Sequence, residues 1–382
     1  MMRVMLTRRL SFILPLALLP ALVACTKHEA PPSPLDPAAD AAVIAKPGVP
    51  HDALARAIDG LFQDKGAGET RALLVLSGGR IVAERYGTGY DQHTRLIGWS
   101  MTKSITGALI GLLVADGRLA LDQSAPVPAW QRPGDPRGAI TLRELLQMRS
   151  GLRHNEASDP VYESGEVRML FLDGRDNMAA WAEEQPLAAE PGTTWRYSSA
   201  TAVILADIAA RALTDSPDPG VRRKVVNDYL RARLFEPAGM IGMAAEFDAA
   251  GTFIGSSMAY GTARDWGRFG ELLRNGGTVN GTQVLPRGWI EFMTSPSPTN
   301  PGYGGQVWLN RPQADGDVML MPGKAPASLF ACIGHLGQYV LVSPTQTLTV
   351  VRLGKSDSKQ RQKVLEHLAE IVSLYPASAN QN

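Results

Sequence analysis

Residues 100–114 read SMTKSITGALIGLLV and contain a single charged side chain, Lys103. The larger apolar side chains recur at helical spacing. They are Ile105, Leu109, Leu112 and Leu113. With so little charge on its other faces, this segment is predicted to be a largely buried helix that begins near Ser100.

The segments around this helix predict a sheet. Two apolar runs on either side of Gly78-Gly79 indicate a β-hairpin over residues 71–86, and short strand-like runs return after Thr278. We expect these strands to form one antiparallel sheet, flanked by the helix-like segments 53–62 and 363–375.

The domain organisation follows from the order of these elements. Residues 51–125 and 270–382 are predicted to form the sheet domain, and the helix-rich stretch 126–269 an inserted all-α lobe. The fold class is therefore α+β, and a cleft between the two parts is the expected ligand site.

Ser100 and Lys103 form an S-x-x-K pair, and residues three apart lie on the same face of a helix. The helix N-terminus favours negative charge on the hydroxyl. A desolvated lysine can lose its proton and act as a base, or remain a cation that favours a neighbouring phenolate. The alternative is an N-cap serine beside a solvated lysine. A second copy, 356–359, lies in a polar stretch that we interpret as a solvated loop.

A second element is Tyr197-Ser198-Ser199, just before the helix-like stretch 200–213. Ser199 is predicted to be the N-cap of that helix. The hydroxyl of Tyr197 could serve as general acid or base, although its reference pKa of about 10 calls for nearby positive charge. The alternative for Tyr197 is a half-buried core aromatic, and Tyr162-Glu163-Ser164 is a competing match.

A third element is His335-Leu336-Gly337-Gln338, between two strand-like runs. Gly337 would let a substrate backbone approach the strand. The N–H of Gln338 is predicted to pair with the N–H of Ser100 as an oxyanion hole. The alternative for His335 is a hydrogen-bonded turn residue.

In the order S-x-x-K, Y-x-S and H-x-G, these elements resemble the serine hydrolases related to class C β-lactamases. That group includes penicillin-binding carboxypeptidases, esterases and 6-aminohexanoate-dimer hydrolases, and the Y-S-S and GHLGQ stretches are most similar to the last of these. The resemblance spans roughly residues 51–375. Supporting stretches lie at 141–152, 186–200, 255–277 and 303–309.

The resemblance implies a β-lactamase/transpeptidase-like fold and a reaction through an acyl-enzyme. Ser100 would be the nucleophile, while Lys103 and Tyr197 share the proton transfers. Substrate or the oxyanion would be bound by Ser199, His335, Gly337, Gln338 and, as a loop aromatic at the substrate edge, Tyr162. No cofactor is implied.

Two positions depart from the β-lactamase pattern. Ser199 stands where those enzymes carry an asparagine, so a shorter hydroxyl replaces an amide. His335 stands where they carry the lysine of K-T-G, so a mostly neutral imidazole replaces a fixed cation. Both changes argue against efficient β-lactam hydrolysis and favour small esters, amides or peptides. A true β-lactamase or D-Ala-D-Ala carboxypeptidase remains an alternative.

Other classes of protein fit less well. A non-catalytic envelope lipoprotein of the same fold could bind a peptide or glycan, but it would not need all three motif residues. An α/β-hydrolase needs G-x-S-x-G, and residues 98–102 lack the last glycine. The six histidines show no H-E-x-x-H spacing, which argues against a metal site. The 38 Lys+Arg balance 37 Asp+Glu, so nothing indicates nucleic-acid binding.

The N-terminus predicts export to a bacterial cell envelope. Basic residues precede an uncharged run that ends in Leu22-Val23-Ala24-Cys25, similar to a lipoprotein signal peptide over 1–24 with lipidation at Cys25. The protein would then be anchored facing the periplasm or the outside, although ordinary signal cleavage is an alternative. Residues 25–50 are predicted to be a Pro/Ala-rich tether. The second cysteine, Cys332, lies in an apolar run and is predicted to be a buried small hydrophobe.

Overall fold

The computed structural model describes residues 34–378. The predicted signal peptide, Cys25 and the first residues of the tether lie outside that range. Within the range, no helix combines the length and the apolarity needed to cross a bilayer.

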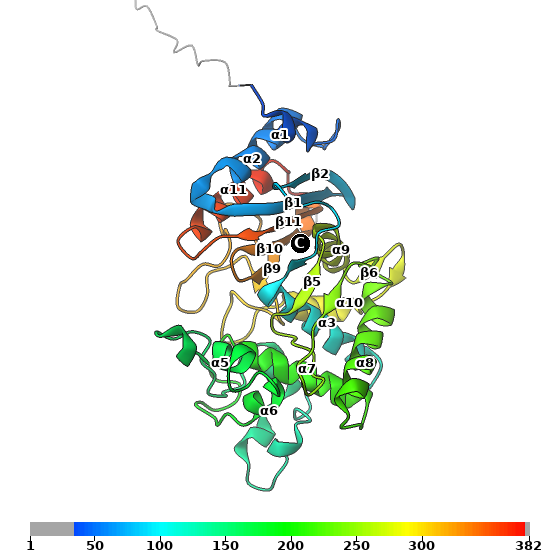
Figure 1. Cartoon of the computed structure of the whole chain (residues 1–382), viewed down its shortest axis with the longest axis vertical. Coiled ribbons are helices and arrows are strands. Elements are labelled where there is room, and N and C mark those ends of the chain that lie inside the picture. The colour runs from blue at the N-terminus through cyan, green and yellow to red at the C-terminus, as the bar shows by residue number, and fades with distance from the viewer. Residues whose placement is uncertain (1–33, 379–382) are drawn as a thin grey trace, which may run out of the picture. The chain divides into compact units, whose positions relative to one another are not determined.

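The centre of the fold is a six-stranded antiparallel sheet with strand order β2-β1-β11-β10-β9-β8 (Figure 1). Its strands are β1 (Glu69–Ser77), β2 (Arg80–Tyr86), β8 (Trp308–Leu309), β9 (Phe330–Gly334), β10 (Gln338–Ser343) and β11 (Leu348–Lys355). The late strand β11 pairs with β1, which joins the early hairpin to the C-terminal meander as predicted. Gly78 and Gly79, with φ of 56° and 80°, make the two-residue turn of that hairpin.

Helices cover both faces of the sheet. Side chains alternate along β1, so Leu73 and Val75 pack with α2 (His51–Gln63) and α11 (Arg361–Ser373), as expected for the flanking helices. Leu74 and Leu76 face the opposite side with α9 (Ala263–Arg274). A Cβ at Gly267 would lie 2.7 Å from Leu74, so this glycine lets α9 approach the sheet closely.

The packing of α9 corrects the predicted end of the helical lobe. Residue 269 was expected to close the lobe, but it lies inside α9, and the whole helix belongs to the sheet layer. An amphipathic helix has the same sequence pattern in either part, so periodicity could not assign it.

The remaining helices form the inserted lobe and its connections, with α7 in the lobe core (Figure 1). They are α3 (Thr102–Ala115), α4 (Leu142–Leu146), α5 (Gly165–Phe171), α6 (Met178–Glu183), α7 (Ser199–Leu213), α8 (Pro219–Leu230), a π-helical turn (Arg231–Phe235) and α10 (Arg287–Thr294). Short 3₁₀ helices are η1 (Lys65–Ala67), η2 (Trp99–Met101), η3 (Pro128–Trp130), η4 (Pro136–Ala139), η5 (Val161–Glu163) and η7 (Pro344–Gln346). Minor strands are β3 (Leu96–Ile97), β4 (Ala244–Ala245), β5 (Ala259–Gly261), β6 (Thr278–Val279) and β7 (Thr282–Gln283).

About two thirds of the expected tether, residues 34–50, belongs to the described structure and contains a helix and a β-bridge, which corrects that prediction. Asp36 caps α1 (Pro37–Ala41), with its carboxylate 2.7 Å from the N–H of Ala38. Val43 is buried and bridges to Ala83 on β2. A cap and a proline suffice to start a one-turn helix, which is too short to show a period.

Cys332 is buried in β9 as a free thiol, as expected. Burial raises its pKa to about 12, so the thiol stays protonated and behaves as a small apolar group.

Candidate active site

The predicted buried helix begins with a tight turn that carries Ser100. Ser100 lies in η2, and the regular helix α3 starts two residues later. Trp99 has a φ of 48°, a left-handed conformation that costs a non-glycine residue about 1–2 kcal/mol. Its ring packs edge-on against His335 at 5.5 Å, and this contact brings the third sequence element next to the first.

Lys103 contacts three oxygen atoms at the base of the site. Its Nζ lies 2.9 Å from Ser100 Oγ, 3.0 Å from Ser199 Oγ and 3.1 Å from the carbonyl oxygen of Ser256. The residue is only 1% exposed, so the alternative of a solvated lysine is wrong. Burial lowers the pKa of Lys103, although nearby carboxylates oppose that change.

Tyr197 completes the group formed by the three predicted catalytic residues. Its side chain lines the same cleft as Ser100, and Lys103 Nζ lies 4.8 Å from the centre of its ring. The ring also packs on Trp308 at 5.3 Å, so Tyr197 is a core aromatic and a site residue at once. Burial and the charge of Glu156 raise its pKa well above the ordinary value, so the hydroxyl keeps its proton near neutral pH.

Ser199 occupies the site differently from the prediction. The N-cap of α7 is Ser198, whose hydroxyl accepts from the N–H of Thr201 at 3.1 Å. Ser199 is the first residue of the helix, and its hydroxyl points to Lys103. The N-cap prediction was therefore displaced by one residue.

Two carboxylates that no motif indicated stand next to Ser199. Glu156 accepts from the hydroxyl and from the backbone N–H of Ser199, both at 2.6 Å. Glu166, in the first turn of α5, lies 3.2 Å from the same hydroxyl. Burial and the charge of Glu156 raise the pKa of Glu166 to about 7. Glu156 lies in irregular chain and Glu166 in a short helix, and the ten residues between them match no known site motif. The sequence therefore contains no signal for this pair.

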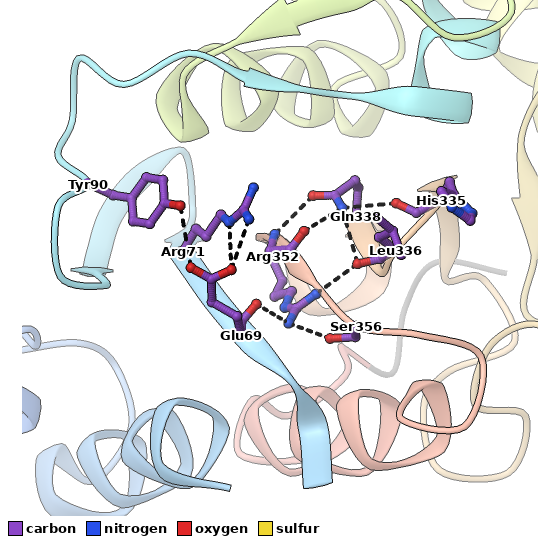
Figure 2. A network of polar contacts seen from close by, with 9 residues as sticks. Glu69, Arg71, Tyr90, His335, Leu336, Gln338, Arg352 and Ser356 are labelled. Carbon is purple, nitrogen blue, oxygen red and sulfur yellow. Dashed lines mark hydrogen bonds and ion pairs between the residues drawn. The ribbon is translucent and has the colours of Figure 1, made fainter. Parts of the chain in front are cut away.

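The third element forms a hairpin turn between β9 and β10, held by two buried side chains (Figure 2). Gln338 Nε2 donates to the carbonyls of His335 at 2.9 Å and Gly354 at 2.7 Å. Arg352 donates to the carbonyls of Gly337 and Glu69, both at 2.8 Å. A Cβ at Gly337, whose φ is 79°, would lie 2.7 Å from Arg352. The conformation and the packing of the turn therefore both require glycine at this position.

The oxyanion role predicted for Gln338 is not supported. Gln338 lines a separate hollow with Arg71 and Lys355, while Gly334 and His335 line the cleft that contains Ser100. A Cβ at Gly334 would lie 2.2 Å from the carbonyl oxygen of Gly98, so the end of β9 adjoins the turn that carries the nucleophile.

Several backbone N–H groups on this side of the cleft donate no backbone hydrogen bond outside the regular helices and strands of the described part of the chain. Those of Ser100 and His335 are among them, and the end of β9 next to His335 adjoins the turn that carries Ser100. They are the better candidates for an oxyanion hole. Burial lowers the pKa of the half-buried His335 ring, which is therefore neutral near pH 7.

The cleft has a volume of about 570 Å³. Its lining includes Tyr197, Glu156 and Glu166, together with the 334–337 turn and the 356–358 loop. Its apolar lining includes Trp308, Met319, Ile333 and Tyr339. The second S-x-x-K copy is a loop as expected, and Asp357, Ser358 and Lys359 are exposed. Only Ser356 departs from that prediction, because it is 3% exposed and bonded to Arg352.

Tyr162 is not brought to this cleft. It lies in η5, is 60% exposed and is absent from the residues that line the cavity. The prediction that it forms the substrate edge is therefore not supported. No group of three or more histidine, cysteine, aspartate or glutamate residues within 34–378 is arranged to hold a metal ion.

Comparison with known proteins identifies relatives of the chain. The β-lactamase family model matches residues 57–373. The 6-aminohexanoate-dimer hydrolase of Paenarthrobacter ureafaciens is 30% identical over 274 residues, which cover 66% of this chain and 64% of that enzyme. The chain therefore matches somewhat less than two thirds of that relative's length.

Solved structures of low sequence identity share the fold. A Bacillus anthracis protein that carries the name of a 6-aminohexanoate-dimer hydrolase has a TM-score of 0.66 at 21% identity, over 84% of this chain and 83% of that one. A family VIII carboxylesterase has a TM-score of 0.58 at 15% identity, over 82% and 96%. A penicillin-binding protein homologue from Caulobacter crescentus has a TM-score of 0.54 at 16% identity, over 84% and 97%.

Proposed function

Because this chain belongs to the β-lactamase family, we propose that it is a serine hydrolase that cleaves a small ester, amide or peptide through an acyl-enzyme on Ser100. The fold class and the family resemblance predicted from the sequence are confirmed. The observation that carries the proposed activity is the buried Lys103 Nζ, 2.9 Å from Ser100 Oγ.

Acylation begins with proton transfer from Ser100 to Lys103. A lysine with a lowered pKa is neutral more often than a lysine in water, so its lone pair can accept the hydroxyl proton. Ser100 Oγ then forms a bond to the substrate carbonyl carbon. The carbonyl oxygen becomes negative, and the N–H groups of Ser100 and His335 are the proposed donors that stabilise it.

Tyr197 is the proposed proton donor to the leaving group. Its raised pKa disfavours the phenolate, so between the two roles left open by the sequence the acid fits better than the base. The bond from the acyl carbon to the leaving group breaks as that group takes the Tyr197 proton, and Lys103 then gives the proton that it took from Ser100 to the Tyr197 oxygen, which restores both residues. Water then attacks the acyl carbon while Lys103 takes one of its protons, and the bond from that carbon to Ser100 Oγ breaks, which releases an acid. Ser100 Oγ takes the proton back from Lys103, whose Nζ lies 2.9 Å away.

The third motif supports the proposed preference for simple esters and amides. His335 is neutral near pH 7, so this position lacks the permanent cation that would pair with a substrate carboxylate. Arg361 lines the same cleft from α11, but its guanidinium donates to the carbonyl of Val318. The apolar lining suits an uncharged acyl group.

An activity-based probe tests this function. A fluorophosphonate should label the wild-type protein at Ser100 and should leave Ser100→Ala unlabelled. Labelling of the alanine variant would exclude Ser100 as the nucleophile. A wild-type protein that stays unlabelled would favour the non-catalytic binding protein of the same fold.

We also propose that the protein is a lipoprotein, anchored through Cys25 in a bacterial envelope and facing the periplasm or the outside. The support is the apolar run that ends at Cys25. Mass spectrometry of the N-terminal peptide from the producing cells tests the anchor. A diacylglyceryl thioether on Cys25 is expected, and a free thiol would refute it.

A further inference from the structure

We propose that Glu156 is a positioning residue: acting through Ser199, it fixes the direction of the hydrogen bonds around Lys103 so that the amine presents its lone pair to Ser100. This inference rests on the proposed function, because it concerns how Ser100 is activated. It assigns a role to a carboxylate that belongs to none of the three motifs.

Glu156 determines where the single hydroxyl proton of Ser199 points. One oxygen of Glu156 lies 2.6 Å from Ser199 Oγ, and the other lies 2.6 Å from the backbone N–H of Ser199. A backbone N–H can only donate, so the carboxylate accepts both bonds and its orientation is fixed. Charge-assisted bonds of this length are strong, and the hydroxyl proton is therefore directed to Glu156.

The consequence reaches Lys103 through the same hydroxyl. With its proton directed away, Ser199 Oγ can only accept from Lys103, at 3.0 Å. The carbonyl oxygen of Ser256, at 3.1 Å, also can only accept. A neutral amine has two N–H bonds and one lone pair. Both N–H bonds are used by these acceptors, so the lone pair is left for the hydroxyl of Ser100 at 2.9 Å.

Glu166 does not hold the same position. Its nearest oxygen lies 3.2 Å from Ser199 Oγ, and it has no contact with the backbone N–H of Ser199. Glutamine cannot replace Glu156 either, because it has one acceptor oxygen and one donor NH₂. In Glu156→Gln, the side-chain NH₂ would face either the hydroxyl or the backbone N–H of Ser199. Two donors would then stand opposite each other with no acceptor between them.

A purely electrostatic role for Glu156 predicts the opposite change in rate. The charged groups that face Lys103 are Glu156 and Glu166, and both raise the pKa of Lys103 against the effect of burial. Removal of the charge of Glu156 would therefore lower the pKa of Lys103 and enrich the neutral amine. If charge alone mattered, Glu156→Gln would react with a serine probe as fast as wild type or faster, most visibly at low pH.

The experiment measures the second-order rate constant of fluorophosphonate labelling at Ser100 between pH 6 and 9. The proteins are wild type, Glu156→Gln, Ser199→Ala and the double variant. The matched control is Glu163→Gln, an exposed residue of η5 on the same stretch of chain. Thermal unfolding of every variant checks that it is folded.

We expect Glu156→Gln to react about tenfold more slowly than wild type at every pH, and Glu163→Gln to react at the wild-type rate. The double variant should be no slower than the slower single variant, because both changes break one chain of hydrogen bonds. If Glu156→Gln does not fold, Ser199→Ala alone decides the question. A wild-type labelling rate in Ser199→Ala would show that the Ser199 hydroxyl does not connect Glu156 to Lys103.

Three results would overturn the inference: Glu156→Gln as fast as wild type, Ser199→Ala as fast as wild type, or multiplicative losses in the double variant. The proposed function fails in a different way. It fails when wild type is not labelled at Ser100, whatever the variants do.

Discussion

Arg352 holds the turn that brings His335 to the cleft, and its replacement by methionine should both destabilise the protein and slow catalysis. The guanidinium is fully buried and has no carboxylate partner among its contacts (Figure 2). Burial lowers the pKa of Arg352 to about 10, so it is still charged at pH 7. Its hydrogen bonds all go to uncharged oxygen acceptors.

The magnitude follows from the bonds that Arg352→Met removes. Three of them are short: 2.8 Å to Gly337 O, 2.8 Å to Glu69 O and 2.7 Å to Ser356 Oγ. Hydrogen bonds to a charged donor contribute about 1.5–3 kcal/mol each, or roughly 5–9 kcal/mol together. Because methionine is uncharged, the variant no longer carries the desolvation penalty of a buried guanidinium. That penalty is several kcal/mol, and its removal offsets part of the loss. We therefore expect the free energy of unfolding to fall by about 3 kcal/mol.

Urea unfolding and p-nitrophenyl butyrate hydrolysis, both at pH 7, measure the two effects. The matched control is Arg71→Met, because Arg71 pairs with Glu69 at the protein surface and should contribute less than about 1 kcal/mol. Under conditions where both variants are folded, kcat/KM should fall in Arg352→Met and not in Arg71→Met. Equal stability and equal kcat/KM of the two variants would refute the role given to Arg352.

Three further outcomes are expected. Lys103→Met should lower kcat/KM for p-nitrophenyl butyrate by about 10³-fold, and a loss of less than tenfold would contradict its role as base. Nitrocefin turnover should be slow compared with that of p-nitrophenyl butyrate, and fast turnover would show that Ser199 and His335 do not disfavour β-lactams. Because the pKa of Glu166 is raised to about 7, the folded state binds its proton more tightly, and stability falls as pH rises from about 4.5 to 7. Glu166→Gln should therefore gain stability relative to wild type between pH 5 and pH 8 in urea unfolding, and a constant difference would contradict the raised pKa.

Local patterns predicted the elements that carry the site. Apolar spacing placed the helix after Ser100, and Gly78-Gly79 placed the first hairpin, because each pattern is complete within one element. The pairing of the late strands with that hairpin followed from the need to bury apolar strands in one sheet. The order of the three motifs along the chain then predicted that Ser100, Lys103 and Tyr197 lie at one site.

The main errors at the site concern contacts between distant segments. Glu156 and Glu166 contact Ser199 only in the folded lobe, so no sequence spacing predicts these contacts. The cleft-facing residue of the third element is set by a turn with Leu336 and Gly337 at positive φ, and the pattern H-x-G does not determine which N–H is left free.

The most direct test of the central claim is to trap the acyl-enzyme. Acid quench during turnover of p-nitrophenyl butyrate, followed by tryptic mapping, should find one butyryl group on peptide 96–103, whose only serine is Ser100. Hydrolysis of the ester with no acylated peptide, or with the acyl group on another peptide, would contradict covalent catalysis at Ser100.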